Sequence, residues 1–193
     1  MFTKLSNKIT DILLGNNTIK QEDREIYCYG VQQGLTLILN ILTTIVIAFV
    51  CREFWQCLIF MISFILPRRY AGGYHAKTPL RCYIYSNAVI FAALLIIKFF
   101  TLGIFICGCL SVISGAIIFF LSPIEAANKP LDDEEKMVYR IRARIILVIL
   151  LVIQFVLSIL NYNTAVMCIS LALFLLAALM VMGMINSRVN KFS

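Results

Sequence analysis

The stretch GVQQGLTLILNILTTIVIAFV, from Gly30 to Val50, contains no charged residue over 21 positions. A helix of about 20 predominantly apolar residues is long enough to cross the hydrocarbon core of a bilayer. Hydrophobic residues make up 61% of the chain, whereas charged residues make up 14%. A soluble domain of 193 residues cannot bury that much apolar side chain, so the excess is expected to face lipid.

Five further apolar segments follow along the chain: Phe54–Leu66, Leu80–Ile97, Leu102–Leu121, Ile145–Leu160 and Ala165–Ile185. Most are long enough to span, and Ile145–Leu160 becomes so if the arginines before it snorkel toward the headgroups. Phe54–Leu66, with 13 residues, suits either a short span or a re-entrant hairpin. The pattern predicts an all-α, polytopic membrane bundle of about six transmembrane helices, folded as one integral-membrane domain over residues 1–193.

The distribution of Lys and Arg favours one topology. If all six segments span and the N-terminus is cytoplasmic, only Arg52 and Lys98 of the 17 Lys and Arg residues lie outside. The positive-inside rule therefore favours six spans with both termini in the cytoplasm. This arrangement explains the net charge of +7 without a nucleic-acid partner. The cations predicted inside are Lys4, Lys8, Lys20, Arg24, Arg68, Arg69, Lys77, Arg81, Lys129, Lys136, Arg140, Arg142, Arg144, Arg188 and Lys191.

Residues 1–28 precede the first span and carry an amphipathic pattern. An amphipathic interfacial helix lying on the inner leaflet is expected here, and a helix packed on the bundle is the open alternative. Residues 122–144 are predicted to form a second cytoplasmic region, between the fourth and fifth spans. The apolar stripe of the N-terminal helix consists of Phe2, Leu5, Ile9, Ile12 and Leu13.

The loop between the second and third segments reads RRYAGGYHAKTPLRC, from Arg68 to Cys82. It holds the single histidine of the chain, His75, and Cys82 follows seven residues later. A thiol and an imidazole are the minimum pair for nucleophilic cysteine catalysis. The pair therefore indicates a membrane-embedded thiol enzyme, with residues 67–82 as its catalytic loop and helix start.

Cys82 differs from the other cysteines in its surroundings. Thr78 can cap a helix whose first residue is Pro79, so Cys82 is predicted in the first helical turn. A helix N-terminus and neighbouring cations stabilise a thiolate. Glycines before His75 allow positive φ and a close approach of another backbone, such as that of a peptide substrate. The residues predicted to bind substrate are Arg68, Arg69, Gly72, Gly73, Lys77 and Arg81.

The remaining cysteines are predicted to be small apolar packing residues. The chain contains no Cys-x-x-Cys pair and no set of histidines that suits zinc, so neither a metal site nor a cofactor is predicted. These packing cysteines are Cys28, Cys51, Cys57, Cys107, Cys109 and Cys168.

The pattern Arg69-Tyr70-x-x-Gly73-x-His75-Ala76-Lys77, followed by Cys82, resembles the signature of the accessory gene regulator protein B family, AgrB. A stretch between Pro123 and Pro130, after the fourth span, fits the resemblance. Members of this family are bacterial membrane cysteine endopeptidases of quorum sensing. The resemblance implies a multi-pass protein of the bacterial plasma membrane with a cytoplasmic active site.

The resemblance also implies a substrate, a short AgrD-type propeptide with an amphipathic N-terminal helix, a central signal segment and an acidic C-terminal tail. Cys82 is expected to attack the carbonyl before the tail, with His75 as the base. The tail leaves, and a nucleophile within the signal segment then closes a thiolactone or lactone ring. A homodimer is the expected assembly, because a small bundle gains shielding for its site from a second copy.

The third catalytic group is left open by the sequence. Four polar residues near cytoplasmic span ends are candidates to orient His75 or to form an oxyanion hole: Gln33, Ser86, Asn87 and Glu125. Each is equally well explained as a polar contact between helices. Two alternative functions also remain open. One is a small non-enzymatic transporter or assembly subunit, and the other is a protease that releases a linear acid.

Overall fold

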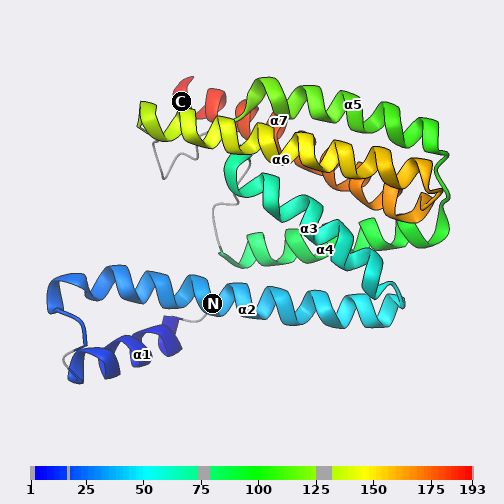
Figure 1. Ribbon diagram of the computed structural model, residues 1–193. Coiled ribbons are helices and arrows are strands. Elements are labelled where there is room, and N and C mark those ends of the chain that lie inside the picture. Colours follow the sequence, from blue (N-terminus) through cyan, green and yellow to red (C-terminus); the bar gives the residue numbers. More distant parts are fainter. Residues whose placement is uncertain (1–2, 17, 74–78, 125–131, 193) are drawn as a thin grey trace. The chain divides into compact units, whose positions relative to one another are not determined.

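The chain is all-α in a computed structural model that describes residues 3–16, 18–73, 79–124 and 132–192 (Figure 1). Within those ranges no β-strand occurs, which confirms the predicted fold class. The helices are α1 (Thr3–Gly15), α2 (Arg24–Cys51), α3 (Phe54–Ala71), α4 (Pro79–Phe99), α5 (Ile104–Leu121), α6 (Asp133–Ile159) and α7 (Asn163–Phe192), with a short 3₁₀ turn, η1 (Gln21–Asp23), before α2.

Among the described residues, five helices are long and apolar enough to cross a membrane. They correspond to five of the six predicted spans: Gln21–Cys51, Leu80–Phe99, Ile104–Leu121, Glu134–Ile159 and Asn163–Ile185. The sixth predicted span lies in α3, whose 18 residues include Pro67 and end in Arg68 and Arg69. These polar residues lower its mean hydropathy. α3 is nevertheless one continuous helix, so the hairpin considered for this segment does not form.

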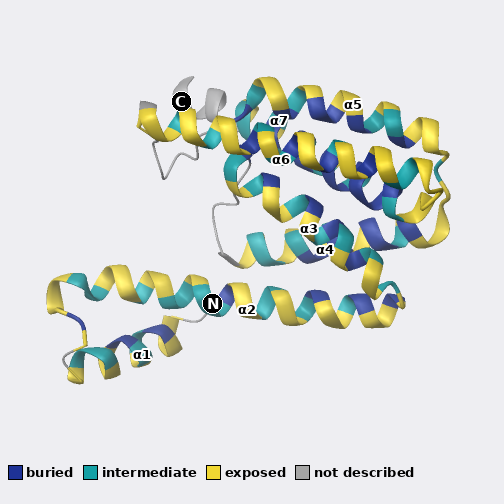
Figure 2. Cartoon of the chain, in the orientation of Figure 1, coloured by how far each residue is buried: buried dark blue, intermediate teal, exposed yellow. Residues whose placement is uncertain are grey.

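The chain divides into two compact units, one formed by Met1–Val50 and Ala76–Phe91 and the other by Cys51–His75 and Ala92–Ser193. The second unit is built around α7. In the most apolar stretch of α7, 56% of the residues are buried, whereas the corresponding share in the other candidate spans is 28% or less (Figure 2). Helices α3, α5 and α6 all pack against α7. Their core consists of Ala71, Ile118, Ala143, Leu147, Leu150, Ile169, Leu173, Leu176, Ala177 and Met180.

Three helix ends meet at one end of this second unit. The amide of Ile124, just after α5, donates to the carbonyl of Ala71 at 2.9 Å, and Gly72 forms an isolated parallel bridge with Ile124. The rings of Tyr70 in α3 and Tyr139 in α6 lie edge to face, 5.7 Å apart. The C-terminal ends of α3 and α5 and the N-terminal part of α6 therefore lie together. This end of the unit, called here the basic end, carries the arginines of α3 and α6: Arg68, Arg69, Arg140, Arg142 and Arg144.

The glycine pair predicted to be conformationally permissive makes this meeting possible. Gly72 has φ +77 and Gly73 has φ +127, values that L side chains rarely adopt. A Cβ on Gly72 would overlap the carbonyl oxygen of Ile124, and one on Gly73 would lie 3.5 Å from the carbonyl oxygen of Leu179 in α7. The close backbone approach expected here is thus made by the protein's own chain.

A buried polar cluster joins α5, α6 and α7 inside the same unit. Gln154 donates to the hydroxyl of Ser170 at 3.0 Å, and Ser111 donates to the same hydroxyl at 3.0 Å. Ser170 in turn donates toward the carbonyls of Cys107 and Val166. Polar groups in an apolar bundle hold helices in register by such contacts.

The first unit contains a helical hairpin formed by α1 and α2. Asp11 in α1 pairs with Arg24 in α2 at 2.8 Å, and the thiol of Cys28 donates to the Oδ1 of Asn7 at 3.0 Å. The buried face of α1 consists of Ser6 and Thr10. α1 therefore contacts α2 through small polar residues, and its predicted position on the inner leaflet stays a prediction.

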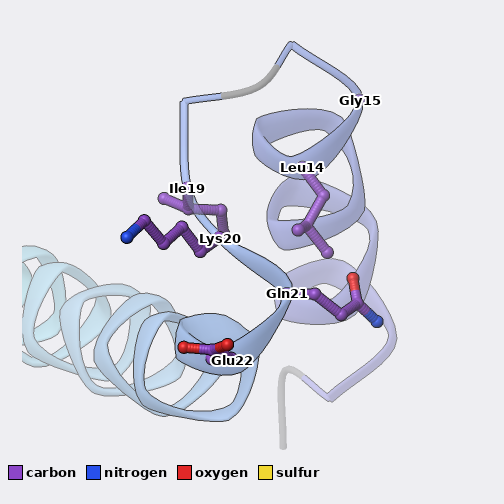
Figure 3. A pocket seen from close by; sticks show the side chains of 6 residues that line it. All are labelled: Leu14, Gly15, Ile19, Lys20, Gln21 and Glu22. Carbon is purple, nitrogen blue, oxygen red and sulfur yellow. The ribbon is translucent and has the colours of Figure 1, made fainter.

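The apolar stripe of α1 is only partly covered by this contact. Leu5 and Ile12 are exposed, and Ile9 and Leu13 are half-buried. A shallow pocket lies where the chain turns from α1 into α2 (Figure 3). It is lined by Leu14, Gly15, Ile19, Lys20, Gln21 and Glu22. The exposed side chains of Leu5 and Ile12 give α1 an apolar surface that can contact lipid.

The Gly72 contact predicts a large cost for adding one methyl group. We expect Gly72→Ala to destabilise the protein by about 1–3 kcal/mol, because it combines backbone strain at positive φ with overlap at Ile124. Gly108→Ala in α5 is the matched control, since a Cβ there meets nothing within 4 Å. The measurement is the Tm of both variants in detergent micelles. Equal Tm values would show that the α3 end is not held by this contact.

Candidate functional site

Cys82 is the fourth residue of α4, because this helix begins at Pro79 as predicted. Its thiol is free and half-buried. Proline is favoured at the first helical position, where its missing N–H leaves no hydrogen bond unmade. The thiol therefore lies within the first turn, at the positive end of the helix.

Two pairs of polar contacts hold α4 against α2 in the same unit. The hydroxyls of Tyr83 and Thr43 lie 2.8 Å apart. One turn further along α4, Asn87 donates to the Oδ1 of Asn40 at 2.8 Å and to the backbone carbonyl of Tyr83 at 2.9 Å. The helix that carries Cys82 is thus fixed in register by side chains that begin at its immediate neighbour.

Asn87 and Ser86, the two candidate orienting residues on α4, differ in whether they still have a hydrogen-bond donor to offer. Both amide protons of Asn87 are used, so this side chain has no donor left for an oxyanion, and its Oδ1 is buried without a partner among the residues described. Ser86 lies one turn beyond Cys82 on the same helix face and is half-buried. Within the described parts of the chain its hydroxyl makes no hydrogen bond, so that hydroxyl remains available.

The other two orienting candidates are Gln33 and Glu125. Gln33 is an exposed residue of α2 and donates to the hydroxyl of Tyr29 at 3.0 Å, one turn away on the same helix. Glu125 lies outside the described residues, and so do His75 and Lys77. The roles assigned to His75 and to these candidates stay predictions.

The basic residues predicted around the pair differ in their surroundings. Arg68 is half-buried, with its guanidinium 5.2 Å from the ring centroid of Phe64. Arg69 is exposed and lies 5.9 Å from the ring of Tyr70. Arg81 is exposed in the first turn of α4, beside Cys82. Arg68 and Arg69 therefore belong to the basic end of the second unit, and Arg81 belongs to the first unit.

Sequence reasoning missed two arginines of α6 at this basic end. The Nε of Arg140 donates to the carbonyl of Ser122 at 3.3 Å, and the guanidinium of Arg142 lies 5.6 Å from the ring of Tyr70. Their charges entered the topology argument alone. Arg140, Arg142 and Arg144 alternate along the helix, so their side chains face different neighbours. This spacing could have indicated that the three arginines have different partners.

The other cysteines fall into two groups. Cys51, Cys57, Cys107 and Cys168 are buried, as predicted for packing residues. Cys109 differs because its side chain is exposed on α5, and Cys28 is half-buried in the contact with α1. No group of three or more His, Cys, Asp or Glu side chains that could hold a metal ion occurs in the described part of the chain.

Comparison with known proteins matches residues 6–182 to the model of one family, described as Accessory gene regulator B. The chain is 30% identical over 129 residues to Accessory gene regulator protein B of Staphylococcus haemolyticus (strain JCSC1435), covering 65% of this chain and 69% of that protein. It is 25% identical over 172 residues to Putative AgrB-like protein 2 of Clostridium perfringens (strain 13 / Type A), covering 85% and 80%. No solved structure matches.

The contact between Asn40 and Asn87 predicts energetic coupling between α2 and α4. We expect Asn40→Ala and Asn87→Ala each to cost about 0.5–2 kcal/mol, and the double variant to cost clearly less than their sum. Gln33→Ala is the control on the exposed face and should cost little. The measurement is a double-mutant cycle of unfolding in mixed micelles. Additive losses would show that the two amides act separately.

Proposed function

Because the chain belongs to the accessory gene regulator B family, we propose that it is a membrane cysteine endopeptidase that processes an AgrD-type quorum-sensing propeptide. The observation that carries this proposal is the position of Cys82, half-buried in the first turn of α4 and directly after the basic loop with the single histidine. A thiol at the positive end of a helix, beside Arg81, suits a nucleophile better than any other cysteine of the chain.

The proposed reaction has two acyl transfers. In the first, His75 takes the proton of the Cys82 thiol, the sulfur attacks the peptide carbonyl before the acidic tail, and the C–N bond breaks as His75 returns the proton to the leaving amine. The signal segment is then held as a thioester. In the second, a thiol or hydroxyl within that segment attacks the thioester, closes the ring and returns a proton to the Cys82 sulfur.

A ring forms only if water is kept away from the thioester. Hydrolysis at the same step gives a linear acid, so the site must favour an internal nucleophile over solvent. Cys82 is half-buried, and the helix that carries it is held to α2 by Tyr83 and Asn87. These features support a shielded thiol at the membrane edge. Ser86 is the residue that we propose to donate to the oxyanion or to orient His75, because its hydroxyl lies on the Cys82 face.

We also propose that α3 crosses the bilayer, which gives six spans with both termini and Cys82 in the cytoplasm. An 18-residue helix is about 27 Å long, close to the thickness of the hydrocarbon core. α3 packs along α6 and α7, and its basic end meets the basic start of α6. Lys98 donates to the carbonyl of Cys51, just before the start of α3. Arg52 and Lys98, the two cations predicted outside, therefore lie near the end of α3 that is opposite to its basic end.

The surrounding bilayer and a second copy of the chain complete the proposed assembly. Many large apolar side chains of the candidate spans are exposed, among them Phe105, Phe120 and Phe155. Side chains of this kind suit contact with lipid tails. A homodimer that shields the thioester remains our proposal for the oligomeric state.

The non-enzymatic alternative, a small transporter or assembly subunit, finds less support. A transporter needs polar residues along a substrate path. The in-span polar residues Asn40 and Gln154 are instead hydrogen-bonded to neighbouring helices, where they serve as contacts within each unit. A substrate path would have to break these contacts. The peptidase is therefore the function we favour.

The nucleophile is tested by exchanging single cysteines. We expect Cys82→Ala to abolish propeptide cleavage in liposomes, because no thioester can form. Cys109→Ala and Cys107→Ala should leave cleavage largely intact, since one side chain is exposed and the other is a small buried group. The product is identified by mass, since a ring and a linear acid differ by one water. Wild-type turnover by Cys82→Ala would end the proposal.

The topology is tested with a thiol reagent that does not cross membranes. In a variant whose Cys28 and Cys109 are replaced by Ala, we expect Cys82 to be labelled from the cytoplasmic side alone. An introduced Arg52→Cys, at the opposite end of α3, should be labelled from outside. The readout is the mass shift of the protein in intact cells and in inside-out vesicles. Labelling of Cys82 in intact cells would overturn the six-span topology.

A further inference from the structure

Two arginines from different helices converge on the ring of Tyr70. The guanidinium of Arg69 lies 5.9 Å from the ring centroid, and that of Arg142 lies 5.6 Å from it. Tyr139 packs edge to face against the same ring at 5.7 Å. Arg69 and Arg142, called here the arginine pair, are thus gathered around one aromatic side chain although 72 positions of sequence separate them.

The positive charge of the arginine pair is not balanced locally. Both side chains are exposed, and in the described ranges neither forms an ion pair with an acidic residue. Exposed Glu134 and Glu135 lie in the first turn of α6, about 10 Å or more along the helix from Arg142. Cation–π contact between an exposed guanidinium and a half-buried ring stabilises the guanidinium only modestly. Two neighbouring cations without a counter-charge favour the binding of an anion.

The other two arginines of this helical turn are already engaged. Arg140 donates to the carbonyl of Ser122 at 3.3 Å. Arg144 lies 4.0 Å from the ring centroid of Phe119 and donates to the carbonyl of the same residue. Both contacts are made to the C-terminal end of α5 and to the segment after it. Among the contacts of the described residues, Arg142 is therefore the arginine of this turn that makes no hydrogen bond, which leaves its donors for a ligand.

The backbone next to Tyr70 is held by contacts with the segment after α5. Tyr70 directly precedes Ala71, whose carbonyl accepts the hydrogen bond from Ile124, and Gly72, whose backbone lies against the same residue. Guanidinium groups present two parallel donors that match a carboxylate. Groups held in place before binding lose less entropy when the ligand arrives. This end of α3 and α6 is thus suited to a peptide that carries carboxylates.

We propose that the arginine pair binds the carboxylates of the substrate's acidic C-terminal tail, with Arg142 as a specificity residue. This inference rests on the proposed function and adds a residue of α6 to the predicted binding set.

The test measures KM for two propeptides, one with its acidic tail and one whose Asp and Glu are replaced by Asn and Gln. We expect Arg142→Gln and Arg69→Gln each to raise KM for the acidic substrate by about 3- to 10-fold, as loss of a charge-assisted contact on a partly solvated surface implies. Losses on the neutral substrate should be much smaller. Arg142→Lys should restore only part of the affinity, because a lysine cannot bind bidentately. Arg52→Gln, an exposed arginine at the opposite end of α3, is the matched control and should change neither KM.

Salt and lipid composition separate the remaining outcomes. For wild type, KM of the acidic substrate should rise with ionic strength, and Arg142→Gln should flatten this slope. Equal losses on both substrates with unchanged salt slopes would overturn the inference while leaving the peptidase itself intact. An effect that follows the fraction of anionic lipid in the vesicles, and not the charge of the tail, would assign the arginine pair to lipid headgroups and would also overturn it. Absence of cleavage of either propeptide by wild type would refute the proposed function instead.

Discussion

The contact between the backbones of Gly72 and Ile124 fixes the basic end of the second unit. A side chain at position 72 would occupy the place of the Ile124 carbonyl, so the two segments approach as closely as they do only because this residue is glycine. The hydrogen bond from Ile124 to Ala71 belongs to the same approach, and Tyr70 packs on Tyr139 beside it. One missing Cβ thus lets the end of α3 and the segment after α5 come together, beside the start of α6.

The membrane helices were predictable because hydrophobic length is a local property. An uncharged run such as Gly30–Val50 identifies a span without reference to the rest of the chain. The start of α4 was predictable for the same reason, since Pro79 marks the first helical position. α3 was ambiguous because its apolar run is short and its last turn is basic. Only its packing along α6 and α7 shows it as a continuous helix within the bundle.

The site was predictable as a set of residues and not as a set of contacts. Cys82 could be singled out from the helix start and the charges beside it. The partners of Asn87 could not, because Asn40 lies 47 positions earlier on another helix. Arg142 was missed for a similar reason, since its neighbour Tyr70 lies on α3. The buried face of α1 was also hidden, because Ser6 and Thr10 gave a weaker pattern than the apolar stripe beside them.

The central position of α7 has a consequence for biogenesis. The ribosome synthesises α3, α5 and α6 first, yet the helix against which all three pack is the last to be made. Until Val166, Leu173 and Met180 have entered the membrane, the earlier helices lack their common core and the hydroxyl of Ser170 that joins Ser111 to Gln154. The second unit therefore completes its fold after translation of nearly the whole chain. A premature stop before α7 would leave α3, α5 and α6 with their contacts to one another but without the core that they share with α7.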